Sequence, residues 1–228
     1  PTTHYVMGGI RVDGDTQMST LPGLFACGEC AAGLHGANRL GGNSLSDLIV
    51  FGKRAGEHAA KFSKENAVVS IDAGQVDRAA REALAPFERA SAAEGPYQVQ
   101  EALQETMQDF VGIVRKASEM ERAMTGIEAL KRRAARVGVP GNREYNPGWH
   151  TALDLKNLLT VSEAVTRSAL ERKESRGGHF RDDFPDKDPA FGSFNFVLTK
   201  GAGGEMQLSR QPIPPMPEHL KAVIEEMK

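Results

Sequence analysis

The spacing of hydrophobic residues divides this chain into a first part with short apolar runs and a longer part with helical stripes. Near the N-terminus, three short runs bounded by glycine, proline or aspartate occupy residues 5–7, 10–12 and 24–27. Runs of this length predict short β-strands, and Asp13-Gly14 predicts a hairpin turn. The run at 24–27 ends in Gly28-Glu29, as a buried strand that ends at a ligand-binding edge would.

Helical spacing begins at Ser44 and recurs along most of the remaining chain. Apolar and small residues at three- and four-residue steps predict helices over residues 44–61, 77 to about 93, and 151–174. A further stripe over residues 99–130, which includes Phe110, Val114 and Ala117, predicts two helices or one bent helix. The later runs at 194–198 and 205–208 flank a glycine-rich segment and predict a β-hairpin, followed by an extended tail and a short amphipathic helix.

This order of elements predicts an α/β part, then an α part, then a small hairpin. We expect a β- and glycine-rich lobe over residues 1–62, a polar linker over 63–76, a helical domain over 77–182 and a C-terminal hairpin and tail over 183–228. The chain begins at Pro1 in a sequence that reads as the middle of a longer protein. We therefore expect a fragment or a processed piece.

Composition narrows the function classes. The chain has 228 residues, 40% hydrophobic and 25% charged, with a formal charge of −2 and a pI of about 6.4. A nucleic-acid partner is disfavoured because no basic field is present. No apolar run approaches the roughly 20 residues of a membrane span, so direct insertion in a bilayer is not expected. Cys27 and Cys30 form a Cys-x-x-Cys pair, which is compatible with a redox dithiol or half a metal site, although thiols that pack a turn are commoner.

The stretch from His35 to Leu45 combines an arginine, three glycines and a predicted helix start. The guanidinium of Arg39 could bind a carboxylate through two hydrogen bonds. The alternative is that Arg39 is an ordinary surface arginine. The helix start at Ser44 offers free backbone N–H groups that stabilise negative charge. Because the P-loop lysine and a Gly-x-Gly-x-x-Gly motif are missing, a flavin, which becomes anionic when it is reduced, fits better than a phosphate.

Three further residues are candidates for a site. His4 could donate to a substrate carboxylate or transfer a proton, although a single histidine near a turn is more often structural. His35 is better explained as a brace of its loop. Glu29 could accept hydrogen bonds from ribose hydroxyls, or could simply be solvated.

These motifs together resemble a known family. Residues 1–9, with His-Tyr-Val-Met-Gly-Gly, residues 22–29 and residues 35–45 closely resemble the flavoprotein subunit of succinate dehydrogenase and fumarate reductase. The resemblance continues through Asn146-Pro147 and residues 169–179, so it covers nearly the whole chain. L-Aspartate oxidase shares His-Gly-Ala-Asn-Arg-Leu but typically continues with Ala-Ser-Asn-Ser, and Gly41-Gly42 here favours the succinate/fumarate branch.

The resemblance implies roles for five residues. It assigns dicarboxylate binding to His4 and Arg39, as anchors for two carboxylates on opposite sides, and FAD contacts to Glu29, Ser44 and Leu45. It implies that residues 1–62 are the C-terminal part of a Rossmann-like FAD-binding domain. It places no catalytic residue and no metal ligand in this chain, because the acid/base arginine and the dinucleotide fingerprint are expected upstream.

The resemblance also implies partners and a location. In the family, electrons pass to an iron–sulfur subunit, and membrane anchor subunits hold the complex, which we expect at the cytoplasmic face of a bacterial inner membrane. The 228-residue chain alone is expected to be colourless and inactive. The alternatives are an L-aspartate oxidase-like flavoprotein and a helical subunit-docking module, since residues 77–175 alone would be typical of a bundle that binds partners.

Overall fold

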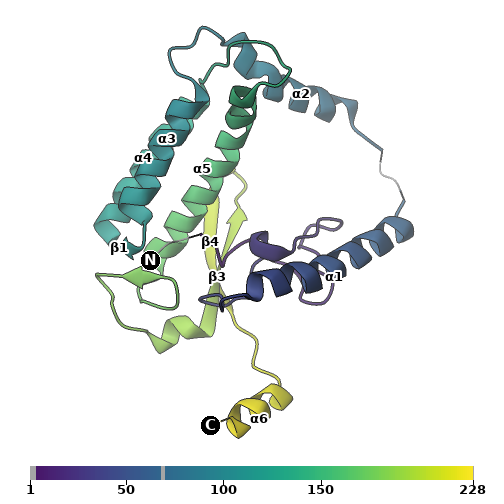
Figure 1. Ribbon diagram of the computed structural model, residues 1–228, viewed down its shortest axis with the longest axis vertical. Coiled ribbons are helices and arrows are strands. Elements are labelled where there is room, and N and C mark those ends of the chain that lie inside the picture. Colours follow the sequence, from purple (N-terminus) through teal and green to yellow (C-terminus); the bar gives the residue numbers. More distant parts are fainter. Residues whose placement is uncertain (1–3, 68–69, 228) are drawn as a thin grey trace. The chain divides into compact units, whose positions relative to one another are not determined.

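The computed structural model describes residues 4–67 and 70–227, and Figure 1 shows its elements. Contacts divide the chain into two compact units: residues 1–84 together with 176–179, and residues 85–175 together with 180–228. The structure mixes helix and strand. No helix in the described part of the chain is both long enough and apolar enough to cross a membrane.

The first unit is built around one long helix. Helix α1, Asn43–Glu65, follows Gly42, whose backbone is left-handed at φ 85°. The short 3-10 helix η1, Gly28–Cys30, packs against α1. Helix α1 ends where the side-chain amide of Asn66 donates a 2.8 Å hydrogen bond to the carbonyl of Phe62. The predicted helix over residues 44–61 is thus present and slightly longer.

The three short strands predicted before residue 28 were wrong. Residues 5–7 form no bridge, and the other two runs contribute only single bridges, which pair Ile10 with Ala31, Val12 with Ser19, and Met18 with Phe25. The predicted Asp-Gly turn is present, because the Asp13 carboxylate accepts hydrogen bonds from Thr16 and Val12 pairs antiparallel to Ser19 beyond it. Isolated bridges form here because no neighbouring segment within the described residues continues the ladder.

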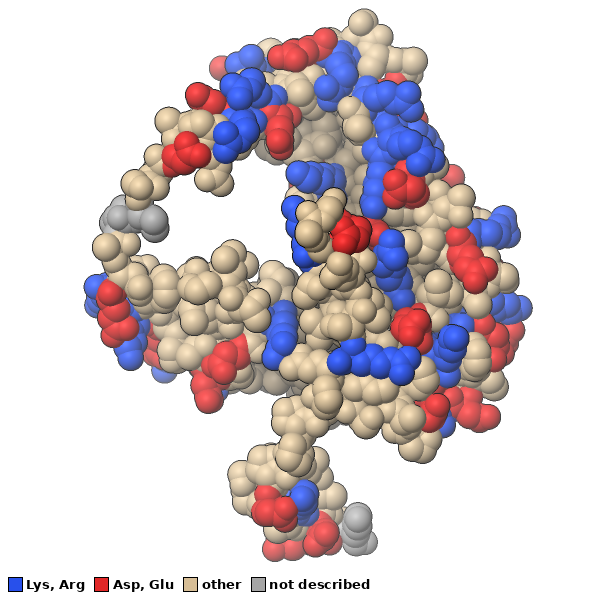
Figure 2. Space-filling model, turned by 180° about the vertical axis from the view of Figure 1, so that it is seen from behind, with Lys and Arg blue, Asp and Glu red and all other residues tan. Residues whose placement is uncertain are grey.

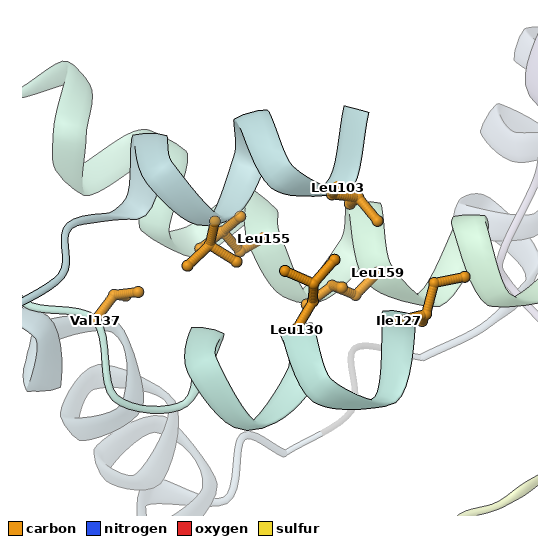
Figure 3. Packing of buried hydrophobic residues seen from close by; sticks show 7 residues of the cluster. Leu103, Ile127, Leu130, Val137, Leu155 and Leu159 are labelled. Carbon is orange, nitrogen blue, oxygen red and sulfur yellow. The ribbon is translucent and has the colours of Figure 1, made fainter. Parts of the chain in front are cut away.

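The second unit contains three packed helices: α3, Pro96–Val111, α4, Ala117–Ala134, and α5, Pro147–Glu171. Figure 3 shows apolar side chains of all three, with Val137, directed toward one another. The buried core cluster consists of Val99, Leu103, Ile127, Leu130, Val137, Leu155 and Leu159. The residues of this cluster that lie on the helices recur at the three- and four-residue spacing from which the helices were predicted. Figure 2 shows both Lys and Arg side chains and Asp and Glu side chains on the face that it draws, in a chain with a formal net charge of −2.

The stripe over residues 99–130 is two helices, and Val114 lies in neither. Helix α3 ends at Val111, and Gly112 adopts φ −64° and ψ −144°, outside the helical region. Val114–Arg115 then forms strand β1, which pairs in parallel with β2, Phe180–Arg181. Val114 is 54% exposed, so its inward position in the predicted stripe was wrong.

Local hydrogen bonds move the ends of two other helices. Helix α2, Ala73–Glu88, begins earlier than predicted because Asp72 accepts a 2.9 Å hydrogen bond from the backbone of Gly74. Helix α5 begins at Pro147 because Asn146 caps it by accepting a 3.1 Å bond from Trp149 N.

The end of α5 is held by Arg181, whose side chain is fully buried. Its guanidinium donates to the carbonyls of Ala169, Leu170 and Arg172, which a helix C-terminus leaves without partners. It also forms two hydrogen bonds, of 2.7 and 2.8 Å, with the carboxylate of Asp183. That contact lowers the pKa of Asp183 to about 2.

The C-terminal hairpin is as predicted. Strands β3, Phe194–Lys200, and β4, Met206–Pro212, pair antiparallel, with Phe194 opposite Pro212 and Lys200 opposite Met206. A 3-10 helix, η2, Pro189–Ser193, precedes the hairpin, and helix α6, Glu218–Glu226, follows it.

Candidate functional site

The two residues predicted to bind substrate lie next to each other in the first unit. Nη2 of Arg39 is 3.3 Å from Nε2 of His4. Because a guanidinium only donates, Nε2 of His4 accepts this hydrogen bond. The glycine-rich loop and the N-terminal segment therefore converge on one point.

Arg39 has unused hydrogen-bonding capacity and no counter-ion among the described residues. Its guanidinium carbon lies 4.4 Å from the ring centroid of Tyr5, and Nη1 donates to the Leu40 carbonyl at 3.3 Å. Its Nε is buried without a hydrogen-bond partner, and no described carboxylate forms an ion pair with this arginine. A buried donor without a partner calls for an explanation, and a positive fork without a counter-ion suits an anionic ligand.

Backbone contacts fix the position of the N-terminal segment. Oε1 of Glu29 accepts a 2.9 Å hydrogen bond from the backbone of Val6. Gly9 approaches Cys30 so closely that a Cβ at Gly9 would lie 2.3 Å from the Cys30 carbonyl oxygen. Only glycine fits at that position. The contacts of Val6 and Gly9 with residues of η1 therefore hold the N-terminal segment that carries His4 and Tyr5. Glu29 is thus partly structural, while its second carboxylate oxygen makes no hydrogen bond to a described residue.

The start of α1 offers an open surface. No side chain caps the helix, the Ser44 side chain makes no hydrogen bond with the described residues, and Leu45 is 67% exposed. Leu48 and Ile49 continue this exposed apolar face. An uncapped helix end beside apolar side chains fits a flat ring system with an electron-rich edge, which is the chemistry of a flavin.

A segment distant in sequence supports the glycine-rich loop. Gly178 N donates a 2.9 Å hydrogen bond to the carbonyl of Ala37, and a Cβ at Gly177 would lie 2.1 Å from the same oxygen. The consecutive glycines at 177–178 are the sequence signal for this close approach.

Sequence reasoning missed one buried acid near the site. Asp47 of α1 is 4% exposed, and its Oδ2 lies 3.4 Å from Nε2 of His35. The same Nε2 is 3.1 Å from the hydroxyl of Tyr5. The available signal was helical spacing, since Asp47 falls four residues before Phe51 and eight before the buried Ala55. His35 thus contacts both the N-terminal segment and α1, as expected for a residue that braces its loop.

Tyr5 remains a neutral phenol in this environment. Burial and the negative charges of Asp47 and Glu29 raise its pKa, against the opposing charge of Arg39.

The two cysteines are free thiols: Cys27 is half-buried, and Cys30 is exposed and donates to the Cys27 carbonyl at 3.3 Å. Among the described residues, neither thiol contacts His4 or Arg39.

Two family models match the chain. A fumarate reductase flavoprotein C-terminal model matches residues 100–222, and an FAD binding domain model matches residues 1–45. Among curated relatives, the fumarate reductase flavoprotein subunit of Haemophilus influenzae is 39% identical over 193 residues, which is 82% of this chain and 32% of that protein. The chain spans about a third of the length of the curated relatives it matches.

Solved structures show the same likeness. Sdh1 of Mycobacterium smegmatis, in complex with UQ1, superposes with a TM-score of 0.91 and 46% identity, covering 97% of this chain and 38% of that one. A variant of E. coli quinol fumarate reductase gives a TM-score of 0.85 and 31% identity over 95% of this chain and 38% of that one. Since the first family model covers more than half of the residues, the chain belongs to the fumarate reductase flavoprotein C-terminal family.

Proposed function

We propose that this chain is the C-terminal part of an FAD-dependent flavoprotein subunit that interconverts succinate and fumarate. The observation that carries the proposal is the convergence of His4 and Arg39, 3.3 Å apart, at a guanidinium that no described carboxylate neutralises. The family membership and the names of the relatives support the same reaction.

The contact between His4 and Arg39 changes the expected binding mode. Two anchors on opposite sides would hold the two ends of a dicarboxylate, whereas nitrogens 3.3 Å apart reach one carboxylate. We propose that Arg39 binds this carboxylate and that His4, when protonated, donates to the same group. The second carboxylate then requires residues outside this chain. Fixing one end positions the substrate carbons for reaction.

The residues at the start of α1 fit the cofactor. Glu29 would hold the ribose through its remaining oxygen, and Ser44 and Leu45 would meet the ring system at the uncapped helix end. FAD, when bound there, supplies the hydride-accepting centre. The chain's own contribution is to position the substrate carboxylate and to hold the cofactor, and we assign the acid/base residue to sequence outside the chain.

We further propose the assembly and domain organisation that the family implies. An iron–sulfur subunit would take the electrons, and membrane anchor subunits would hold the flavoprotein peripherally at the cytoplasmic face of the inner membrane. Residues 1–62 would complete a FAD-binding domain, joined by a linker at 63–76 to a helical domain at 77–182 and a hairpin and tail at 183–228. The 228-residue chain alone should be colourless and inactive, and stoichiometric flavin absorbance would contradict this.

Replacing Arg39 with Ala in the full-length protein tests the proposed function. Succinate oxidation and fumarate reduction should both fall at least roughly 100-fold, because a charged group that binds the substrate is lost. FAD content should be retained. Arg11→Ala is the matched control, since Arg11 is an exposed arginine in the same unit. Unchanged turnover in Arg39→Ala, or faster oxidation of L-aspartate than of succinate by the unmodified protein, would contradict the proposal.

A further inference from the structure

One oxygen atom of the buried Asp47 carboxylate, Oδ2, lacks a hydrogen-bond partner in the described part of the chain. Its residue is 4% exposed, and Oδ2 has no hydrogen-bond partner among residues 4–67 and 70–227. Removing a carboxylate oxygen from water without a partner is unfavourable, so such an atom in a folded protein calls for a reason. Two proton-bearing groups face this carboxylate: His35, whose Nε2 lies 3.4 Å from Oδ2, and the hydroxyl of Tyr5, whose pKa is raised by burial and by its interaction with Asp47.

His35 faces two oxygen atoms through one nitrogen. Nε2 is 3.1 Å from the Tyr5 hydroxyl and 3.4 Å from Asp47 Oδ2, and the His35 side chain is only 8% exposed. An unprotonated Nε2 would direct its lone pair at a carboxylate oxygen. We therefore assign the tautomer that carries its proton on Nε2, between the two oxygen atoms.

Tyr5 links His35 to Arg39. Its hydroxyl meets His35, and its ring faces the guanidinium of Arg39 at 4.4 Å. Asp47 on α1 thus contacts His35, His35 contacts Tyr5, and the Tyr5 ring faces Arg39, while Asp47 also interacts directly with Tyr5. Both His35 and Arg39 belong to the glycine-rich loop.

We propose that Asp47, His35 and Tyr5 form a positioning chain that fixes the guanidinium of Arg39 for carboxylate binding. This inference rests on the proposed function, because it assigns to the chain the orientation of the same arginine. None of the three residues is catalytic. Asp47 fixes the tautomer and the direction of His35, His35 orients the Tyr5 hydroxyl, and the Tyr5 ring limits the directions that the guanidinium can take.

The test measures binding of malonate, a dicarboxylate without adjacent methylene groups to oxidise, to the full-length FAD-loaded protein by isothermal titration calorimetry. Tyr5→Phe, which removes one oxygen atom and keeps the ring, should weaken malonate binding about tenfold, as should Asp47→Asn. FAD content and melting temperature should stay the same. Glu57→Gln, an exposed acid on the same helix, is the matched control and should bind malonate like the unmodified protein.

Two further comparisons separate positioning from a purely structural role. His35→Ala should lose binding, and His35→Gln should regain most of it, because the glutamine amide places an N–H donor near the position of Nε2. The double variant Tyr5→Phe/Asp47→Asn should bind no more weakly than the worse single variant, as expected for members of one chain. If Asp47→Asn does not fold, Tyr5→Phe and the two His35 variants decide the question.

The outcomes distinguish this inference from the proposed function. Malonate binding within twofold of the unmodified protein in Tyr5→Phe and His35→Ala would overturn the positioning chain, as would a lower melting temperature with unchanged binding. Arg39→Ala belongs in the same series. If it binds malonate normally, the proposed function itself is wrong; if it loses binding while the other variants keep it, only the positioning chain is wrong.

Discussion

Arg39 and His4 are separated by 35 residues in sequence, yet Nη2 of one lies 3.3 Å from Nε2 of the other. This closeness is the basis for our proposal that the two side chains bind one ligand group. It also means that the two side chains influence each other, so their substitutions should not have independent effects.

The first prediction concerns that coupling. In the full-length protein, His4→Ala and Arg39→Lys should each raise the KM for succinate, and the double variant should lose less than the sum of the two effects. The expected coupling is about 1–2 kcal/mol. Steady-state kinetics on the four proteins of the cycle provide the measurement. Strictly additive losses would show that the two residues bind different groups.

The second prediction tests whether Arg39 acts through its positive charge alone or also through the planar shape of its guanidinium. Lysine keeps the positive charge of Arg39 but cannot form two parallel hydrogen bonds to a carboxylate. Arg39→Lys should therefore reduce kcat/KM for succinate by about 10- to 100-fold while leaving the absorbance of bound FAD unchanged. Full activity in this variant would indicate that only charge, and no bidentate contact, is used.

The third prediction concerns Arg181, which is 0% exposed. Asp183→Asn removes its paired carboxylate and should lower the free energy of unfolding by about 3 kcal/mol, because it leaves a buried charge uncompensated. The matched control is Asp182→Asn, whose ion pair with Lys116 at 3.1 Å is half-exposed and should contribute less than about 1 kcal/mol. Chemical denaturation of the variants measures both, and equal losses would contradict the buried-pair argument.

The same pair predicts a pH dependence. The pKa of Asp183 falls from 3.8 to about 2 in the folded state, so its stabilisation is present above pH 3.8 and is lost as the pH falls toward 2. The loss should be about 2 kcal/mol over that interval, on the usual conversion of pKa differences. Denaturation curves at pH 5 and at pH 2.5 should differ less in Asp183→Asn than in the unmodified protein. An equal pH dependence in both would assign the effect to other groups.

The fourth prediction concerns the core cluster. Leu155 is 1% exposed among the apolar side chains of α3 and α4, so Leu155→Ala should lower the free energy of unfolding by about 3 kcal/mol. Leu153 on the same helix is 39% exposed, and Leu153→Ala should change the free energy by less than about 1 kcal/mol. A similar loss in both variants would mean that the packing shown in Figure 3 does not stabilise the bundle.

The sequence was most informative where structure depends on local spacing. Val99, Leu103, Ile127 and Leu130 recur at helical intervals, and all four are buried in one cluster. The hairpin was equally readable, since the glycine-rich segment at 201–204 forces a turn between two apolar runs. Both patterns arise from neighbours along the chain, which a sequence displays directly.

Contacts between segments that are distant in the sequence could not be predicted from local spacing. Val114 has a spacing compatible with a helix, but Gly112 ends the helix and β1 pairs with Phe180 more than 60 residues away. Asp47 looks like an ordinary helix residue until the fold places it against His35. The proposed roles of His4 and Arg39 rest on the motif resemblance, and the 3.3 Å contact between them appears only in three dimensions.

The most direct test of the account is a structure of the full-length, FAD-loaded protein with malonate bound. We predict that a single malonate carboxylate contacts both His4 Nε2 and the guanidinium of Arg39, with the Tyr5 ring still facing that guanidinium. Malonate bound away from Arg39, or with its two carboxylates divided between His4 and Arg39, would contradict the account.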